Sequence, residues 1–471
     1  MKLTLLQKIQ SDFRNDDDFR VRTIKCGTSL TVVCLDTMAD NKKVCDFVLL
    51  PLTCVPNVAN VNEVKDSFSN GTTVDECSVL CDAEDKLVNG YTLVFGEDGE
   101  KCVAVDTRTS TGRSIAEPPT SMVMRGPREG FVEDAKVNLT LLRKRLKTTS
   151  FKTNCISVGK YTNTAVYVCF LEGIADNKVV DDIIQRLQKI VIDGVLDSSY
   201  LAKYLDPQRT ILFRRVGLTE KPDVAVGKML EGRVAIVVDG SPMALTLPYL
   251  YVEDLQSPGD YYENSAMTSV NRALRIVSVL MSVLLPSLYV CLQMYNYQII
   301  PLKFLITILN ATEAIPFSPL GEMILVIVIF DILREANLRM PSAVGISLSL
   351  VGAIVLGDAA VKAGLIGAPA VMIGALSGIG LFTMPDNTFV LSFFRIVITA
   401  IGGICGIFGV TLCMLVILVY LCSLQTDKTP FMAPCAPDIP QDRQDAVGQK
   451  PLQSQKMRPK SIPNVNKKRR D

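Results

Sequence analysis

Charged side chains are frequent in this sequence as far as Arg275 and then become sparse until Asp427. Residues 276–295 carry no charge at all, and about 20 apolar residues are enough for a helix to cross a bilayer. Further apolar runs follow at 341–357, 363–385 and 396–422. This break in composition predicts a soluble N-terminal region followed by an α-helical, multi-pass transmembrane domain over residues 266–425.

The flanks of the apolar runs indicate an orientation. Arg272 and Arg275 precede the first run and KKRR lies near the C-terminus, so the positive-inside rule places both ends in the cytoplasm and requires an even number of crossings, four by this count. Segment 299–338 is predicted to be interfacial or re-entrant, because its end, DILREANLR, is amphipathic. Arg334 and Arg339 would then lie outside, so a fifth crossing stays open.

The soluble region contains an internal repeat. CLDTMADNK at 34–42 matches FLEGIADNK at 170–178, and each follows an alternating apolar run and precedes an amphipathic helical pattern. Later in each copy comes a hairpin pattern, GYTLVFGEDGEKCVAV from Gly90 and GRVAIVVDGSPMALTL from Gly232. The repeat predicts a strand followed by an Asp-capped helix in each copy, and then a hairpin.

These patterns divide the soluble region into two related α/β subdomains, over residues 1–145 and 146–265. The residues from 426 to 471 are rich in Pro, Gln, Lys and Arg, which predicts a disordered basic tail that could touch anionic membrane lipid. Charges interrupt the first residues before an apolar stretch can form, so we expect no cleavable signal peptide.

Composition excludes several classes of chemistry. The chain has no histidine, which excludes Ser-His-Asp and Cys-His catalysis and zinc sites that need histidine. Its 14 cysteines are scattered, and Cys77 and Cys81 lack the two-residue gap of a redox or zinc motif. Reduced thiols suit a cytoplasmic soluble region. No phosphate loop, dinucleotide fingerprint or nucleophile elbow is present. We therefore expect no enzyme, no metal and no cofactor.

The overall charge gives no reason to expect a nucleic-acid partner, because 49 basic residues stand against 48 acidic ones.

Several sequence blocks carry a family resemblance. They are EPPTSMVMRGPREGF at 117–131, EGRVAIVVDGSPMALTLP at 231–248, QSPGDYY before the first apolar run, PFSPLGEMILVIVIFDILREANLRMP and GDAAVKAGL. In this order they resemble the GerA family of spore germination proteins, from about residue 15 to Pro437.

The resemblance implies the A subunit of a nutrient germinant receptor. Such a subunit lies in the spore inner membrane with its soluble region facing the spore core. It assembles with a transporter-like B subunit and a lipoprotein C subunit, and it forms an oligomeric, nutrient-gated ion channel. Two alternatives stay open: an accessory membrane protein of calcium dipicolinate transport, and a non-conducting scaffold for receptor subunits. Asp358 and Ile327 depart from the family pattern, which has Gln and an acidic residue there.

Three acidic residues of the apolar half are candidates for an ion pathway: Glu322, Glu313 and Asp358. A carboxylate at membrane depth is costly, so it is a functional candidate. The Ser-Pro pair at 318–319 also predicts a helix start, where the helix dipole would favour Glu322 one turn later, so a capping role stays open. Asp358 and Lys362 are four residues apart and could simply form an ion pair.

A second group of candidates lies in the RGPREGF block. Arg125 and Arg128 flank Gly126-Pro127 in a predicted turn, where a basic loop could bind an anion or a neighbouring subunit. Alternatively, Arg128 and Glu129 anchor the loop between the two subdomains. The residues themselves do not decide between these two interpretations.

Overall fold

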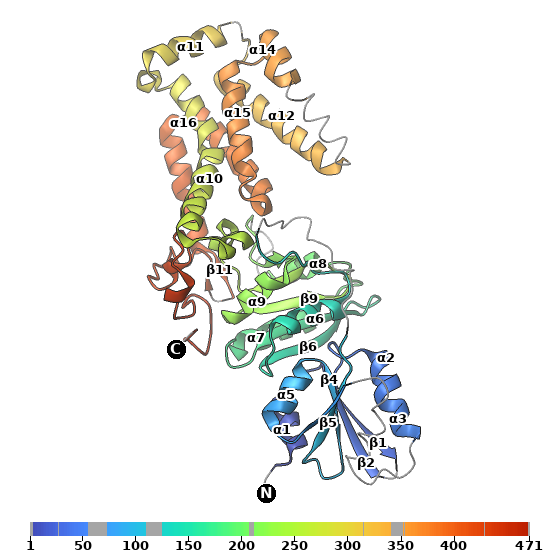
Figure 1. Ribbon diagram of the computed structural model, residues 1–471. Coiled ribbons are helices and arrows are strands. Elements are labelled where there is room, and N and C mark those ends of the chain that lie inside the picture. The colour runs from blue at the N-terminus through green and yellow to red at the C-terminus, as the bar shows by residue number, and fades with distance from the viewer. Residues whose placement is uncertain are drawn as a thin grey trace.

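In the computed structural model the described residues are 3–26, 28–54, 73–109, 125–206, 212–313, 315–340, 352, 354–427 and 429–469. Figure 1 shows three parts arranged along one long axis. The first lobe, with the N-terminus, lies at one end, the second lobe lies in the middle, and a helical region lies at the other end. The two lobes are the predicted α/β subdomains.

The first lobe is a five-stranded antiparallel sheet with helices. Its strands are paired in the order β1-β2-β4-β5-β3. The elements are α1 (Leu5–Asp12), β1 (Phe19–Cys26), β2 (Thr28–Leu35), α2 (Asn41–Val44), η1 (Cys45–Leu49), α3 (Leu50–Cys54), β3 (Val74–Cys77), α5 (Leu80–Val88), β4 (Tyr91–Phe95) and β5 (Cys102–Asp106).

The second lobe repeats this topology, because its sheet has the order β6-β7-β9-β10-β8. Its elements are α6 (Ala135–Arg145), β6 (Phe151–Val158), β7 (Thr164–Leu171), α7 (Asn177–Gln188), α8 (Ser198–Leu205), β8 (Gly217–Thr219), α9 (Pro222–Leu230), β9 (Val234–Val238) and β10 (Ala244–Leu247). The predicted pair of related α/β units is therefore confirmed.

The repeated residues have equivalent roles in the two lobes. Asp40 accepts a hydrogen bond from the Lys42 backbone N–H at 2.9 Å and so caps α2, and Asp176 caps α7 in the same way at 3.0 Å. The predicted hairpins are β4–β5 and β9–β10. One boundary differs from the prediction: α6 packs in the core of the second lobe, so that lobe begins near Ala135 and not at 146.

Buried charges join the two lobes. Arg143 of α6 lies 2.7 Å from carboxylate oxygens of both Asp16 and Asp18, which follow α1. The Thr153 hydroxyl of β6 donates to Asp16 at 2.7 Å. Because Arg143 and Asp16 are buried, separating the lobes would leave a charge without its partner, which is strongly unfavourable. We therefore treat the lobes as one unit.

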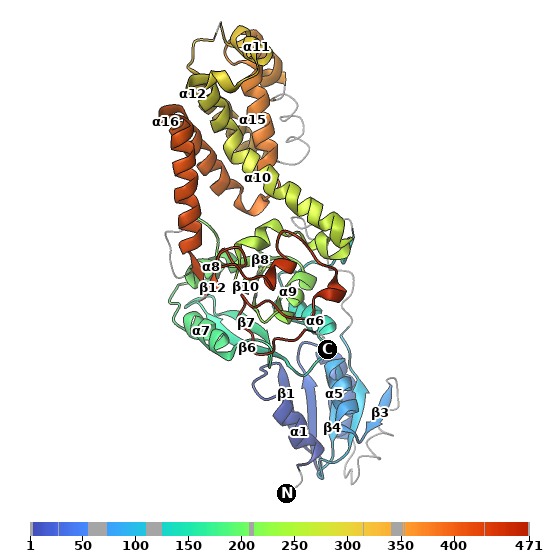
Figure 2. The ribbon, with the colours of Figure 1, turned by 90° about the vertical axis from the view of Figure 1, so that its left-hand side faces the viewer.

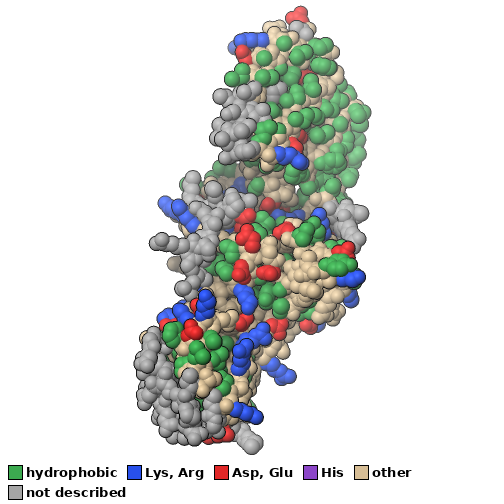
Figure 3. Space-filling model, turned by 90° about the vertical axis from the view of Figure 1, so that its right-hand side faces the viewer, with side chains coloured by type: hydrophobic (Ala, Val, Ile, Leu, Met, Phe, Trp, Pro, Cys, Tyr) green, Lys and Arg blue, Asp and Glu red, His purple; other side chains and the backbone are tan. Residues whose placement is uncertain are grey.

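The helical region follows β10 and begins with two short turns, η2 and η3. Its elements are η2 (Tyr251–Leu255), η3 (Pro258–Tyr262), α10 (Ser265–Met294), η4 (Tyr297–Ile299), α11 (Leu302–Thr312), α12 (Pro319–Arg339), η5 (Val355–Ala359), α14 (Ala360–Lys362), α15 (Ala368–Leu381), η6 (Pro385–Asn387) and α16 (Thr388–Ser423). Figure 3 shows a face of this region covered mainly by hydrophobic side chains, whereas the lobes present mixed charges.

Among the described residues, two helices are long and apolar enough to cross a membrane, Ser265–Met294 and Pro385–Ser423. The predicted span 276–295 lies in the first of these, and α15 is a shorter apolar helix within the predicted span 363–385. The segment predicted as interfacial or re-entrant, 299–338, holds two separate helices, α11 and α12. Most of the predicted span 341–357 lies outside the described residues.

The predicted single span 396–422 is wrong, because α16 consists of two limbs. Gly406 has φ 65° and ψ −159°, a conformation that is essentially restricted to glycine and that interrupts the helix. The hydroxyl of Tyr295, just beyond α10, donates to the carbonyls of Gly403 and Ile404 at 2.9 Å, so these freed acceptors are satisfied. Both ends of α16 return to the second lobe (Figure 2).

The C-terminal residues also differ from the prediction of a disordered tail. The described residues from 429 form β12 (Thr429–Pro430), paired with β11 (Gln425–Thr426), and the short turns η7 (Asp442–Gln444) and η8 (Leu452–Ser454). Further on, the Val465 backbone N–H donates to the Ile174 carbonyl at 2.9 Å, and Arg458 Nε donates to the Leu230 carbonyl at 2.8 Å. The tail is held by polar contacts with the lobe, which a count of its own apolar residues cannot reveal.

Candidate functional site

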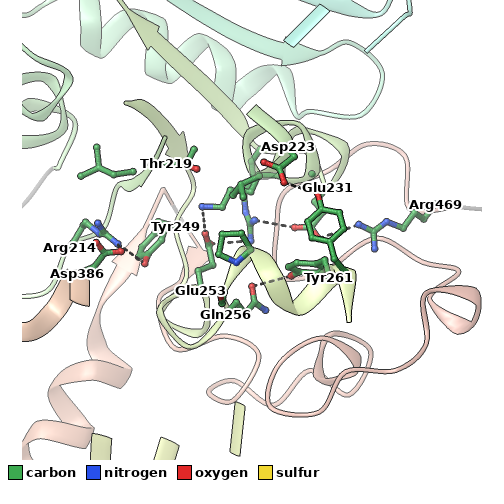
Figure 4. Close-up of a pocket in the computed structure, with 18 residues that line it drawn as sticks. Arg214, Thr219, Asp223, Glu231, Tyr249, Glu253, Gln256, Tyr261, Asp386 and Arg469 are labelled. Carbon is green, nitrogen blue, oxygen red and sulfur yellow. Dashed lines mark hydrogen bonds and ion pairs between the residues drawn. The ribbon is translucent and has the colours of Figure 1, made fainter. Parts of the chain in front are cut away.

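A cavity of about 410 Å³ lies where the second lobe meets the foot of the helical region. The helix α9, the strand β8 and the turns η2 and η3 supply most of its walls. Asp386, in η6 just before α16, and Arg469, from the tail, also line it. Figure 4 shows the charged side chains of these elements converging on the same space. We call this space the junction cavity, because residues of the second lobe, of η6 and of the tail all line it.

Charges of opposite sign alternate along one wall of the junction cavity. Lys228 Nζ lies 2.7 Å from Glu253 Oε2, and the other oxygen of Glu253 lies 3.1 Å from Arg233. Arg233 also contacts Glu231 at 3.1 Å, and Glu231 in turn contacts Arg469 at 3.4 Å. The side chain of Glu253 is 5% exposed. Each internal member neutralises two neighbours, so removal of one leaves buried charge uncompensated.

The pKa values along this chain shift in different directions. Burial lowers the pKa of the Lys228 ammonium below its ordinary value, although Glu253 opposes the shift. Burial alone would raise the pKa of Glu253, but Arg233 and Lys228 together hold it below its ordinary value. The pKa of Glu231 is raised by burial, even though Arg233 and Arg469 lie beside it. Of these two carboxylates, Glu253 is therefore the one whose charge the neighbouring cations stabilise.

A second cluster ties the start of α16 to the lobe. Arg214 Nη2 lies 2.9 Å from Asp386 and donates to the Tyr249 hydroxyl at 3.2 Å. The Asn387 amide donates to Asp254 at 2.7 Å. The other end of α16 is fixed by an apolar cluster, which comprises Phe213, Tyr249, Leu424 and Phe431. Both ends of the α16 hairpin are therefore attached to the same lobe.

The foot of α10 is attached through Asp260. Arg275 contacts both oxygens of Asp260, at 2.7 and 2.8 Å, and Arg272 Nε donates to it at 3.1 Å. Burial would raise the pKa of Asp260, but these guanidinium groups and a backbone N–H hold it below its ordinary value. Arg272 and Tyr261 also donate to Asp445 of the tail, at 3.0 and 2.9 Å. The arginines that indicated orientation are thus structural ion-pair partners as well.

Comparison with known proteins shows the family of this chain. Residues 7–461 match the family described as Bacillus/Clostridium GerA spore germination protein. The chain belongs to the GerA family. It is similar to spore germination protein KA of Bacillus subtilis strain 168, with 32% identity over 98% of this chain and 87% of the relative.

Two further proteins are similar to this GerA-family chain. The uncharacterized membrane protein YfkQ of Bacillus subtilis strain 168 is 31% identical over 92% of this chain and 85% of the relative. The crystal structure of the N-terminal domain of the A subunit of the Bacillus megaterium spore germinant receptor GerK3 is 26% identical. That match covers 53% of this chain and 98% of the solved chain, with a TM-score of 0.42. The resemblance inferred from the sequence blocks is confirmed at the level of the family.

The block 117–131 of this GerA-family chain is described from Arg125 on, and its RGPREGF part approaches Tyr262, which lines the junction cavity. Gly126 has φ +117°, and a Cβ there would lie 2.7 Å from the ring of Tyr262, which belongs to the QSPGDYY block. The Tyr262 hydroxyl donates to Asp223 of α9 at 2.7 Å. Two blocks that are more than 100 residues apart in the sequence therefore meet at one aromatic ring.

The predicted contact residues of this block have different environments in the structure. Glu129 forms an ion pair with Arg145 of α6 at 2.7 Å, a contact that ties this block to the second lobe. Arg125 and Arg128 are exposed. Their exposure is compatible with contact to another subunit, and it leaves that prediction untested.

The three acidic candidates in the helical region have separate environments. Glu322 is 1% exposed and accepts a hydrogen bond from the Gly367 backbone N–H at 2.6 Å, just before α15. Ser318 caps α12 as predicted, because it accepts from the Gly321 N–H at 3.3 Å. Glu313 is exposed at the end of α11. Asp358 forms the expected pair with Lys362 at 2.8 Å, at an exposed site.

The sequence interpretation missed a polar cluster deep in the helical region. Arg395 of α16 is fully buried, contacts Asp331 of α12 at 2.8 Å and donates to the Ser377 hydroxyl of α15 at 3.1 Å. Ser377 donates to the Ser282 carbonyl of α10 at 2.6 Å. The available signal is a lone arginine between Phe-Phe and Ile-Val-Ile, directly before the predicted run 396–422.

Proposed function

We propose that this chain is the A subunit of a nutrient germinant receptor of spores. In this proposal it is a multi-pass protein of the spore inner membrane, and its lobes face the spore core. It assembles as a homo-oligomer and with transporter-like B and lipoprotein C subunits. It forms an ion channel that opens on a nutrient signal, and it performs no enzymatic reaction.

The junction between lobe and helices is the observation that supports a signalling role. Asp260 and its two arginines hold the foot of α10, and Arg214 holds the start of α16. The alternating charges around Glu253 lie between these two attachments. Movement of the second lobe would therefore be transmitted to the longest apolar helices. A receptor that gates ion flow needs such a connection.

The arrangement of α16 supports the proposed orientation. With Gly406 at the far end, both ends of α16 return to the lobe side, and the foot of α10 lies there too. At about 1.5 Å per residue, each limb of α16 is about 25 Å long, close to the thickness of a bilayer core. An even number of crossings, with both chain ends in the cytoplasm, is compatible with this hairpin.

Glu322 is our candidate for a residue of the ion pathway. It is a buried carboxylate near the glycine-rich helix α15, and the helical region offers few other acidic groups. Glu322→Gln keeps an oxygen that can accept from Gly367 and removes the charge. We expect a severalfold change in cation flux when the purified oligomer is placed in liposomes.

The control is Glu335→Gln, near the end of the same helix, where the carboxylate is 42% exposed and pairs with Arg339. This variant should conduct like wild type. If Glu322→Gln also assembles and conducts like wild type, Glu322 is not part of the pathway. If the purified protein is strictly monomeric or does not conduct ions, the channel proposal is wrong, and the alternative of a non-conducting scaffold for receptor subunits is favoured.

Deletion of the gene separates the receptor from the accessory role. A receptor subunit should be needed for the response to particular nutrients, and spores that lack it should otherwise be intact. Loss of dipicolinate loading, or of dipicolinate release with every trigger, would instead favour the accessory protein of dipicolinate transport.

A further inference from the structure

A groove on the outside of the helical region combines apolar walls with guanidinium groups. It is lined by α12, α15, the first limb of α16, and Gly352 and Gly357, and it has a volume of about 410 Å³. Ile379 and Phe382 line it and are 65% and 64% exposed, so the groove is open to the surroundings of the helices. Figure 3 shows the mainly hydrophobic surface of the helical region, which is interrupted by a few charged side chains toward the lobes.

The described lining of the groove carries an excess of positive charge. Arg334 and Arg395 face one carboxylate, Asp331. Arg395 has its main contacts to Asp331 and Ser377, and its Nε has no hydrogen-bond partner among the described residues. Arg334 lies 3.4 Å from Asp331 and stacks over Phe389, and its buried Nε likewise has no partner there. Unused N–H groups of this kind suit an anion with several oxygens.

The depth of these arginines suits a lipid headgroup. Arg395 is joined through Ser377 to Ser282 of α10. Ser282 lies six residues after Ile276, where the uncharged run begins, which is about 9 Å along the helix. Glu322 lies beside Gly367, just before α15, and Asp331 and Ser377 of α15 both contact Arg395, so α12 and α15 run in the same direction, toward the lobes. Arg334 is therefore nearer than Asp331 to the lobe side.

We propose that this groove binds an anionic phospholipid of the lobe-side leaflet. Arg334, supported by Arg395, holds the phosphate, and an acyl chain lies along Ile379 and Phe382. Basic pockets between membrane helices on the cytoplasmic side are suited to anionic headgroups. The apolar wall distinguishes a lipid from free phosphate, which would gain nothing from it. The inference rests on the membrane placement in the proposed function, but it does not require ion conduction.

The test uses the purified full-length chain in detergent and native mass spectrometry. Phosphatidylglycerol and phosphatidylcholine with the same acyl chains are added at matched concentrations. Wild type should retain phosphatidylglycerol in preference, and Arg334→Gln should lower that preference about fivefold, as expected for one basic group near a membrane surface. Arg334→Lys keeps the charge and should retain most of the preference.

The matched control is Arg339→Gln on the same helix, where the side chain is 79% exposed and paired with Glu335. It should bind phosphatidylglycerol like wild type. Equal loss in both Gln variants, or no loss in Arg334→Gln, would overturn the site. If millimolar inorganic phosphate displaces phosphatidylglycerol, the site binds a free anion and the lipid proposal is wrong. If wild type binds the lipid but conducts no ions in liposomes, the lipid site stands and the channel proposal fails.

Discussion

Substitution of Glu253 by Gln removes the central negative charge of the junction cavity. Its carboxylate lies 2.7 Å from Lys228 and 3.1 Å from Arg233, and it is 5% exposed. Gln keeps the size of the side chain and an oxygen that can accept from the Leu250 backbone N–H, as Glu253 does at 2.9 Å. The change therefore isolates the charge, and it leaves two buried cations with one compensating partner fewer.

Breaking a buried ion pair on one side costs about 3–5 kcal/mol. For a lobe of this size, we expect the melting temperature of Glu253→Gln to fall by on the order of 10 °C. Tyrosine emission of the full chain in detergent can follow the transition, because the protein has no tryptophan and nine of its 13 tyrosines precede residue 265.

The control is Asp358→Asn, which removes a carboxylate from the exposed pair with Lys362. Exposed pairs of this type contribute about 0–1 kcal/mol, so its melting temperature should stay within a few degrees of wild type. If Glu253→Gln melts as close to wild type as Asp358→Asn does, the alternating charges do not stabilise the junction and our account of the site is wrong.

Three further substitutions test other parts of the structure by the same melting assay. The pKa of Asp260 is held below its ordinary value, so its contribution to stability is present above about pH 4 and is lost as the pH falls through the folded-state pKa. Asp260→Asn should therefore have a lower melting temperature than wild type at pH 6, and its melting temperature should fall less between pH 6 and pH 3. Gly126→Ala should cost about 1–3 kcal/mol of stability, because of the φ of +117° and the contact of the new Cβ with Tyr262. Tyr262→Ala should relieve part of that cost. A Gly126→Ala variant as stable as wild type would contradict the close approach of Gly126 to the Tyr262 ring. Gly406→Ala should cost about 1–3 kcal/mol of stability, because the conformation of Gly406 is unfavourable for other residues. Gly378→Ala is the control and should be tolerated, since a Cβ there meets nothing within 4 Å. Equal effects of the two substitutions would argue against the α16 hairpin.

Local patterns were sufficient to predict the lobes. Asp40 and Asp176 stand before amphipathic helical patterns, and alternating apolar residues flank Asp-Gly turns, so capping and strand pairing follow from residues near one another in sequence. The repeat of these patterns then predicts two units of the same kind. The break in charge at Arg275 predicts the change to apolar helices for an equally local reason.

Features that depend on distant contacts were not predictable in this way. Gly406 looks like a packing glycine in a Gly-rich helix, and only the contact with Tyr295 explains how the chain can reverse there. Lys228 and Glu253 are 25 positions apart and look like surface charges of separate elements. The tail has few apolar residues, but Asp445 binds Arg272 near the foot of α10. Tertiary contacts decide each of these cases.

The shared strand order has a consequence for how the two lobes can diverge. When the copies are aligned at Gly90 and Gly232, the positions of Glu231 and Arg233 are occupied by Asn89 and Tyr91 in the first copy. The first copy therefore lacks these junction charges, and Figure 1 shows it at the end farthest from the helices. The second copy is therefore constrained by its attachment to the helices, whereas the corresponding surface of the first copy carries no such constraint. Substitutions that suit a new binding partner can accumulate on the first copy without disturbing the attachment of the second.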